Sequence, residues 1–266
     1  MAKLNYRFTY DTLFKLLFTR YPDLLKRLVA AILGITAGSI SEFVITNPDI
    51  PPESLGDKFC RLDINMVVDG QRVNLEVQVA DEGDYPERSL YYWAREYSSS
   101  LQKSGMYSSL PRVIIISIVD FQMFKCAEYH SEFHPLEVRR HEPLSDRMAL
   151  YYFELGKLPE NIDIKNELEL LLSLFRARTE AELKRLEALE VPIVTQAIGA
   201  YREITISEEF RELERLRADA RHNEASALAN AERREREKWR GVVADRDAAL
   251  ADRDARIAEL EALLKK

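Results

Sequence analysis

The amino-acid sequence predicts an α/β domain with the element order α-β-β-β-α-β and a mixed central sheet, followed by a C-terminal helical tail. Hydrophobic residues make up 46% of the 266 residues, which is enough for a packed core. Strand-like alternation and apolar runs lie before about residue 160. Beyond residue 205 the chain has no proline and is rich in Ala, Arg, Glu and Leu, which is typical of a long helix. We therefore expect a sheet-containing domain at 1–158, a helical connector at 159–203 and a charged helix at 204–266.

Composition and charge exclude several classes of protein. The net charge is −7, whereas a protein that coats nucleic acid non-specifically is basic, so any contact with nucleic acid must be local. The N-terminus lacks the apolar region of a signal peptide, and no apolar stretch approaches the roughly 18 residues of a membrane span. Two cysteines do not make a disulfide framework. We expect a cytoplasmic protein and no membrane partner.

The elements expected before residue 160 are helices at 9–19 and 22–33, strands at 41–46, 59–68 and 72–79, a helix at 85–103, and strands at 113–119, 127–139 and 147–155. Apolar residues recur at helical spacing in the first two. Pro22 ends the first helix and suits the first turn of the second, which Gly34 ends. Asp84 and Glu87 suggest a capping box at the start of the third helix. The continuous apolar run at 113–119 predicts a strand covered on both faces.

The hairpin at 59–79 carries the first functional signal. Polar and apolar residues alternate along both strands, and the two-residue turn Asp69-Gly70 fixes their register. In that register Asp63 lies directly opposite Glu76, on the polar face. A shift of one residue would place Asp63 opposite an apolar face, so the alternation itself selects this register.

Two carboxylates in directly opposite positions repel each other. Arg61 would offset the repulsion, as would a shared proton or a divalent cation. Carboxylate oxygens are ligands that suit Mg²⁺ or Mn²⁺. The alternative interpretation is an ordinary hairpin whose polar side faces solvent.

The helix at 85–103 carries two stripes of side chains. Its apolar stripe contains Leu90 and Trp93. A second stripe contains Arg88, Tyr92 and Arg95, a combination that contacts phosphates and stacks on bases. The alternative is a half-buried helix whose arginine side chains extend to solvent.

Several motifs, in this order and spacing, resemble the Rpn family of recombination-promoting nucleases and transposases, which belongs to the PD-(D/E)XK nuclease superfamily. They are Tyr10-Asp11-Thr12-Leu13-Phe14-Lys15-Leu16-Leu17-Phe18, Leu62-Asp63-Ile64, Leu75-Glu76-Val77-Gln78 and Tyr91-Tyr92-Trp93-Ala94-Arg95. The resemblance covers residues 6–157. It implies a restriction-endonuclease-like core at 1–158 and Mg²⁺-dependent (or Mn²⁺-dependent) cleavage of DNA, in recombination or transposition.

The resemblance also implies roles for single residues. Asp63 and Glu76 match the metal-binding and catalytic acids, and Asp11 matches an acidic position on the first helix. Gln78 stands where the wider superfamily has Lys, and Gln supplies neither a positive charge nor a base. A Glu-x-Gln is familiar in the Rpn-like group, so the departure lowers the expected rate more than it denies activity. Lys15 or Arg88 is a candidate for the missing charge.

The expected nucleic-acid-binding residues are Lys15, Arg88, Tyr92 and Arg95. The alternative to an endonuclease is a nuclease-like fold that has lost catalysis and serves as a DNA-binding or assembly module, oligomerising through its C-terminal helix. The Gln78 substitution and the acidic net charge favour that alternative.

The tail contains a seven-residue repeat that predicts one seam of a coiled coil. The apolar residues seven apart are Val243, Leu250, Ile257 and Leu264. Arg246 and Arg253 occupy the second seam position, so a single solvated helix held by Glu–Arg pairs is the alternative. A coiled coil would make the protein a homodimer or higher homo-oligomer and bring two nuclease sites together.

Overall fold

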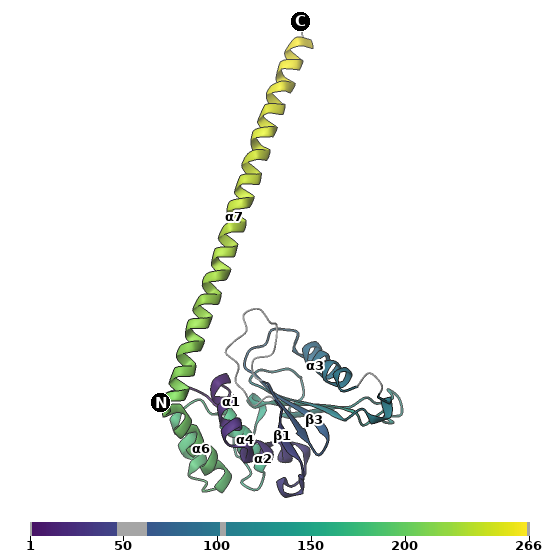
Figure 1. Cartoon of the computed structure of the whole chain (residues 1–266), viewed down its shortest axis with the longest axis vertical. Helices are drawn as coiled ribbons and strands as arrows, with labels where there is room; N and C mark the ends of the chain where they lie inside the picture. Colours follow the sequence, from purple (N-terminus) through teal and green to yellow (C-terminus); the bar gives the residue numbers. More distant parts are fainter. Residues whose placement is uncertain (1, 47–62, 102–104, 265–266) are drawn as a thin grey trace. The chain divides into compact units, whose positions relative to one another are not determined.

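The computed structural model describes residues 2–46, 63–101 and 105–264 (Figure 1). Its helices are α1 (Asp11–Arg20), α2 (Pro22–Leu33), α3 (Tyr85–Ser99), α4 (Glu167–Arg176), α5 (Glu180–Glu187), α6 (Pro192–Ile206) and α7 (Glu208–Leu264). Its strands are β1 (Phe43–Ile45), β2 (Asp63–Val68), β3 (Gln71–Gln78), β4 (Val113–Val119), β5 (His130–Phe133) and β6 (Met148–Glu154). The predicted α/β class and the order α-β-β-β-α-β are confirmed.

The six strands form one mixed sheet in the order β1-β2-β3-β4-β6-β5. The three strands β3, β4 and β6 run parallel, and the outer pairings are antiparallel. All seven residues of β4 are buried, as its continuous apolar sequence predicts for a strand covered on both faces.

The β2–β3 hairpin has the predicted register. Asp69 and Gly70 have φ angles of 45° and 75°, the left-handed conformations of a tight two-residue hairpin turn. The backbone register pairs Asp63 with Glu76 and Asn65 with Asn74. The first part of the expected strand, before residue 63, lies outside the described residues.

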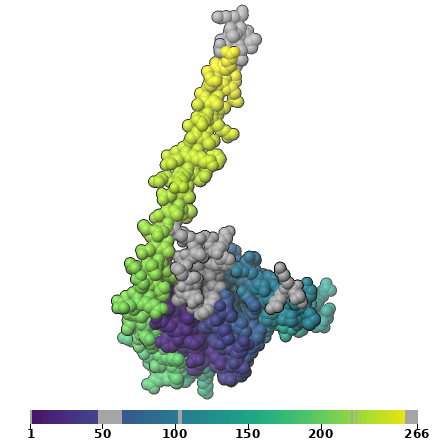
Figure 2. All heavy atoms as spheres, in the orientation of Figure 1, coloured from purple at the N-terminus to yellow at the C-terminus, as the bar shows by residue number. Residues whose placement is uncertain are grey.

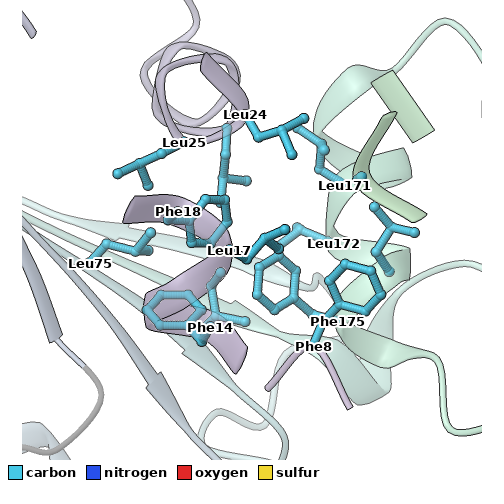
Figure 3. Close-up of a cluster of buried hydrophobic side chains, with 14 of the residues drawn as sticks. Phe8, Phe14, Leu17, Phe18, Leu24, Leu25, Leu75, Leu171, Leu172 and Phe175 are labelled. Carbon is cyan, nitrogen blue, oxygen red and sulfur yellow. The ribbon is translucent and has the colours of Figure 1, made fainter. Parts of the chain in front are cut away.

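One face of the sheet packs against α1 and α2, and buried residues of α4, α5 and α6 belong to the same cluster. Figure 3 shows Leu75 of β3 directed toward Phe14 and Phe18 of α1. On the other side of α1, Leu172 and Phe175 of α4 complete the cluster. Because neighbouring residues of a strand point to opposite faces, burying Leu75 here directs Glu76 to the other face.

The helices α4, α5 and α6 belong to the same compact unit as the sheet, a unit that ends at Leu213. Tyr201 of α6 stacks on Phe8 and donates a hydrogen bond to the Tyr6 carbonyl. The segment expected as a connector is therefore helical and packed into the core. The domain boundaries at 158 and 203 stay a prediction.

The other face of the sheet packs against α3, which lies across the sheet from α1 and α4 (Figure 1). Asp84 precedes the helix, but the predicted capping box is wrong. Asp84 has φ −130° and ψ 13° and makes no side-chain cap hydrogen bond, because capping geometry needs an extended residue there. The helical phase also differs, since Tyr85 and Ser89 face the sheet whereas Leu90 is 46% exposed.

The helix α7 extends the chain as 57 residues with side chains exposed along most of its length (Figure 2). The predicted seam residues Leu250 and Ile257 are each 46% exposed. Within the described residues, no helix has both the length and the apolar character that crossing a membrane requires.

Candidate active site

A row of polar residues crosses the α3 face of the sheet. The backbone register places Asp63 of β2, Glu76 of β3, Ser117 of β4 and Tyr152 of β6 side by side on four successive strands. Glu76 and Ser117 are both 0% exposed. From Glu76 to Tyr152, the α3 face therefore carries a buried polar strip.

Glu76 is held at both of its carboxylate oxygens. The Tyr85 hydroxyl donates to Oε2 over 2.9 Å, and the Gln78 side-chain amide donates to Oε1 over 2.9 Å. The alternative of a solvent-facing polar surface does not describe this position, because Glu76 lies beneath α3. A buried carboxylate with fixed orientation is the arrangement that a rigid ligand site requires.

Burial raises the pKa of Glu76 above its ordinary value of 4.5, since the charged form loses solvation. The hydrogen bond from Tyr85, the charge of Arg88 and the hydrogen bond from Gln78 act in the opposite direction. Burial also raises the pKa of Tyr85 well above 10.0, so its hydroxyl stays protonated and remains a donor to Glu76.

Four residues that the sequence did not point to form hydrogen bonds along this strip: Tyr85, Ser89, Ser117 and Tyr152. The Tyr85 hydroxyl also forms a hydrogen bond of 2.8 Å with Ser117 Oγ. Ser89, one turn further along α3, forms a hydrogen bond with the Tyr152 hydroxyl. The signal available for Ser117 was a single polar residue inside the apolar run of β4.

Arg88 adds a positive charge above the site. Its Nη2 donates to Gln78 Oε1 over 3.0 Å, and its Nη1 pairs with Glu82 over 2.7 Å. Its guanidinium carbon also lies 5.1 Å from the centre of the Tyr85 ring. Gln78 thus links the Arg88 guanidinium to the Glu76 carboxylate.

The other predicted DNA-binding residues of α3 lie in different environments. Tyr92 is half-buried and packs against the apolar cluster under α3. Arg95 is exposed. The stripe predicted from helical spacing is therefore not a uniform surface.

Asp11 and Lys15 lie on α1 and form an ion pair with an N–O distance of 3.5 Å. Just before α1, Arg7 pairs with Asp120 over 2.6 Å, and the Asp120 N–H donates to the Gln78 carbonyl over 2.9 Å. These contacts anchor the start of α1 at the edge of the sheet where β3 and β4 end. The assignments of Asp11 and Lys15 stay predictions.

Of the two predicted ligands, Glu76 has a described side chain, and its chemistry suits a hard divalent cation. Glu76 supplies a buried carboxylate whose charged form is disfavoured without a partner, and the register puts the backbone of Asp63 directly opposite it. Carboxylate oxygens are the ligands that Mg²⁺ prefers. Over residues 2–46, 63–101 and 105–264, no group of three or more His, Cys, Asp or Glu residues gathers into a larger metal-binding cluster.

The raised pKa of Glu76 gives a pH-dependent stability. The folded chain holds the Glu76 proton more tightly than the unfolded chain does. The protonated carboxyl therefore adds to the free energy of unfolding below about pH 4.5, and this stabilisation is lost as the pH rises through the pKa of the folded state. Glu76→Gln cannot ionise. Thermal melts from about pH 4 to about pH 8 should show the melting temperature of Glu76→Gln rising relative to that of the native chain. A difference that is independent of pH would contradict this prediction.

The chain is thus an α/β protein with a buried carboxylate between its sheet and α3. The chain matches the family model of the PD-(D/E)XK nuclease family transposases over residues 8–231 and belongs to that family. No curated protein and no solved structure matches it significantly. The match extends past the motifs at 6–157 and includes α4, α5 and α6. It indicates a nuclease or transposase role and confirms the resemblance to a PD-(D/E)XK nuclease.

Proposed function

We propose that the protein is a metal-dependent DNA endonuclease that hydrolyses phosphodiester bonds, in recombination or transposition. Asp63 and Glu76 hold the cation, Mg²⁺ or Mn²⁺. The observation that carries this proposal is the buried Glu76 carboxylate, fixed at both oxygens and opposite Asp63 in the hairpin register. Family membership supports the same reaction class.

Each protein group at the site has a part in this proposal. Tyr85 and Gln78 fix the orientation of the Glu76 carboxylate, so that no reorganisation is needed when the substrate arrives. A bound Mg²⁺ would supply Lewis-acid chemistry, polarising the phosphate and lowering the pKa of water. Asp11, from the start of α1, assists at the edge of the site.

Gln78 stands where the wider superfamily has a lysine, and we propose that Arg88 provides the missing positive charge. The Arg88 guanidinium contacts the Gln78 side-chain oxygen, and Gln78 in turn contacts Glu76. Lys15 is the weaker candidate because its ion pair is with Asp11 on its own helix, whereas Arg88 contacts Gln78 directly. Gln78 then orients water or substrate rather than transferring a proton.

We propose DNA as the partner, contacted by Lys15, Arg88, Tyr92 and Arg95. Arg95 is exposed and suited to a phosphate, whereas Tyr92 is half-buried and offers only part of its ring.

We also propose that a second copy of the chain pairs along α7, where Leu250 and Ile257 are exposed seven residues apart. Sedimentation of the full chain would show a dimer, which Leu250→Lys would weaken.

The second candidate function is an inactive DNA-binding or assembly module. The Gln78 amide favours it, since this side chain supplies neither a charge nor a base. The two candidates differ in one outcome. The endonuclease gives a metal-dependent product, whereas the module gives binding or assembly without cleavage.

The test is the nicking of supercoiled plasmid DNA by the full chain with Mg²⁺, with Mn²⁺ and with EDTA. We expect cleavage with either metal, none with EDTA, and loss of cleavage in Asp63→Ala. The control is Asp146→Ala, because the native Asp146 side chain is 87% exposed. Cleavage that survives in Asp63→Ala or in EDTA would contradict the proposal, and no cleavage by the native chain with any metal would favour the module.

A further inference from the structure

A cavity lies on the same face of the sheet as the polar strip. It has a volume of about 300 Å³, and its polar lining consists of Thr46, Asn65, Arg72, Asn74 and Glu96. Asn65 and Asn74 face each other on β2 and β3, two residues along each strand from Asp63 and Glu76. Since a strand rises about 3.3 Å per residue, the two pairs lie roughly 7 Å apart.

Asn74 has a buried polar atom without a partner. Asn74 is only 7% exposed, and its Nδ2 donates a hydrogen bond to Asn65 Oδ1 over 2.8 Å. Among the described residues, its Oδ1 accepts no hydrogen bond. A buried amide oxygen is unfavourable without a donor, so this cavity suits a ligand that brings an N–H group.

The rim of the cavity has a flat cationic group. Arg72 pairs with Glu96 of α3 over 3.1 Å, and this contact restricts its guanidinium plane. Guanidinium planes stack on nucleic-acid bases, and asparagine amides bind the amino edge of adenine. The cavity therefore combines an acceptor for an amino group with a surface for stacking.

We propose that this cavity takes an adenine of the DNA substrate, with the exocyclic amino group donating to Asn74 Oδ1, beside the phosphate that Asp63 and Glu76 act on. The inference rests on the proposed endonuclease function and adds to it a preference for one class of base. A base that presents no amino hydrogen leaves Asn74 Oδ1 without a donor and binds more weakly.

The experiment measures binding of two single-stranded oligonucleotides to the full chain by fluorescence anisotropy, with Ca²⁺ in place of Mg²⁺. One oligonucleotide contains adenine, and the other contains purine, which lacks only the amino group, at the same positions. We expect the native chain to bind the adenine oligonucleotide at least about fivefold more tightly. This comparison needs no variant, so it does not depend on the folding of a mutant.

Asn74→Leu, which removes the acceptor at similar volume, should abolish the difference between the two oligonucleotides. The matched control is Gln71→Met, because Gln71 also has an unpartnered buried oxygen but does not line the cavity. It should keep the difference.

Equal binding of the two oligonucleotides by the native chain would overturn this inference alone if plasmid is still cleaved with Mg²⁺. Persistence of the difference in Asn74→Leu would also overturn it. Absence of both binding and cleavage would overturn the inference together with the proposed function.

Discussion

Replacing Glu76 with Gln is expected to reduce Mg²⁺-dependent nicking of supercoiled DNA by a factor on the order of a thousand. The substitution keeps the size and shape of the side chain but removes the charge that would hold the cation. Glu76 is 0% exposed and lies opposite Asp63 in the hairpin register. The rate of plasmid nicking at saturating Mg²⁺ measures the effect.

Glu142→Gln is the matched control, since the Glu142 side chain is 66% exposed and lies in a different part of the unit. It should nick at the native rate. A cooperative thermal unfolding transition of Glu76→Gln at about pH 8 would separate loss of chemistry from loss of fold. Native-like nicking by a folded Glu76→Gln would remove Glu76 from the catalytic site.

Phe175→Ala is expected to lower the free energy of unfolding by about 3–5 kcal/mol. Phe175 is 2% exposed, and its ring contacts Phe8, Phe14 and Phe18. Truncation would leave a cavity between α1 and α4 that the surrounding rings cannot fill. Chemical denaturation followed by circular dichroism measures the change.

The control for this prediction is Leu228→Ala on α7, where the native side chain is 63% exposed. Its effect should stay within about 0.5 kcal/mol. A similarly small effect of Phe175→Ala would show that α4 is not part of the stabilising core, and that the segment after residue 160 acts as the connector first expected from the sequence.

The hairpin could be predicted because residues that are close in sequence determine its turn and its register. Asp69-Gly70 specifies a two-residue turn, and strict alternation leaves one register, so the Asp63–Glu76 pairing follows from residues close in sequence. The apolar run of β4 likewise specified a buried strand. These elements depend on backbone preference and on periodicity, which a sequence displays directly.

The surroundings of Glu76 were not predictable in the same way. The contact between Tyr85 and Ser117 joins residues 32 positions apart, and it depends on how α3 is rotated against the sheet. That rotation buries Ser89 and exposes Leu90, opposite to what hydrophobicity alone suggests. Tyr85 and Ser89 on the buried face of this helix form hydrogen bonds with the polar strip, and hydropathy does not register such contacts.

The packing of α4, α5 and α6 could not be predicted from the amino-acid composition either. Their apolar residues resemble those of any amphipathic helix, and nothing in the spacing tells whether the partner is the same sheet or another chain. The contacts of Phe8 with Phe175 and Tyr201 bring the N-terminus against these helices across more than half of the chain.

The central claim is that Glu76 and Asp63 together bind a divalent cation, and calorimetric titration of Mg²⁺ into the full chain at about pH 8 tests it most directly. We predict one binding event per chain in the native protein and in Asp146→Ala, and none in Glu76→Gln or Asp63→Ala. Undiminished Mg²⁺ binding by both of those variants, or no binding by the native protein, would contradict the account.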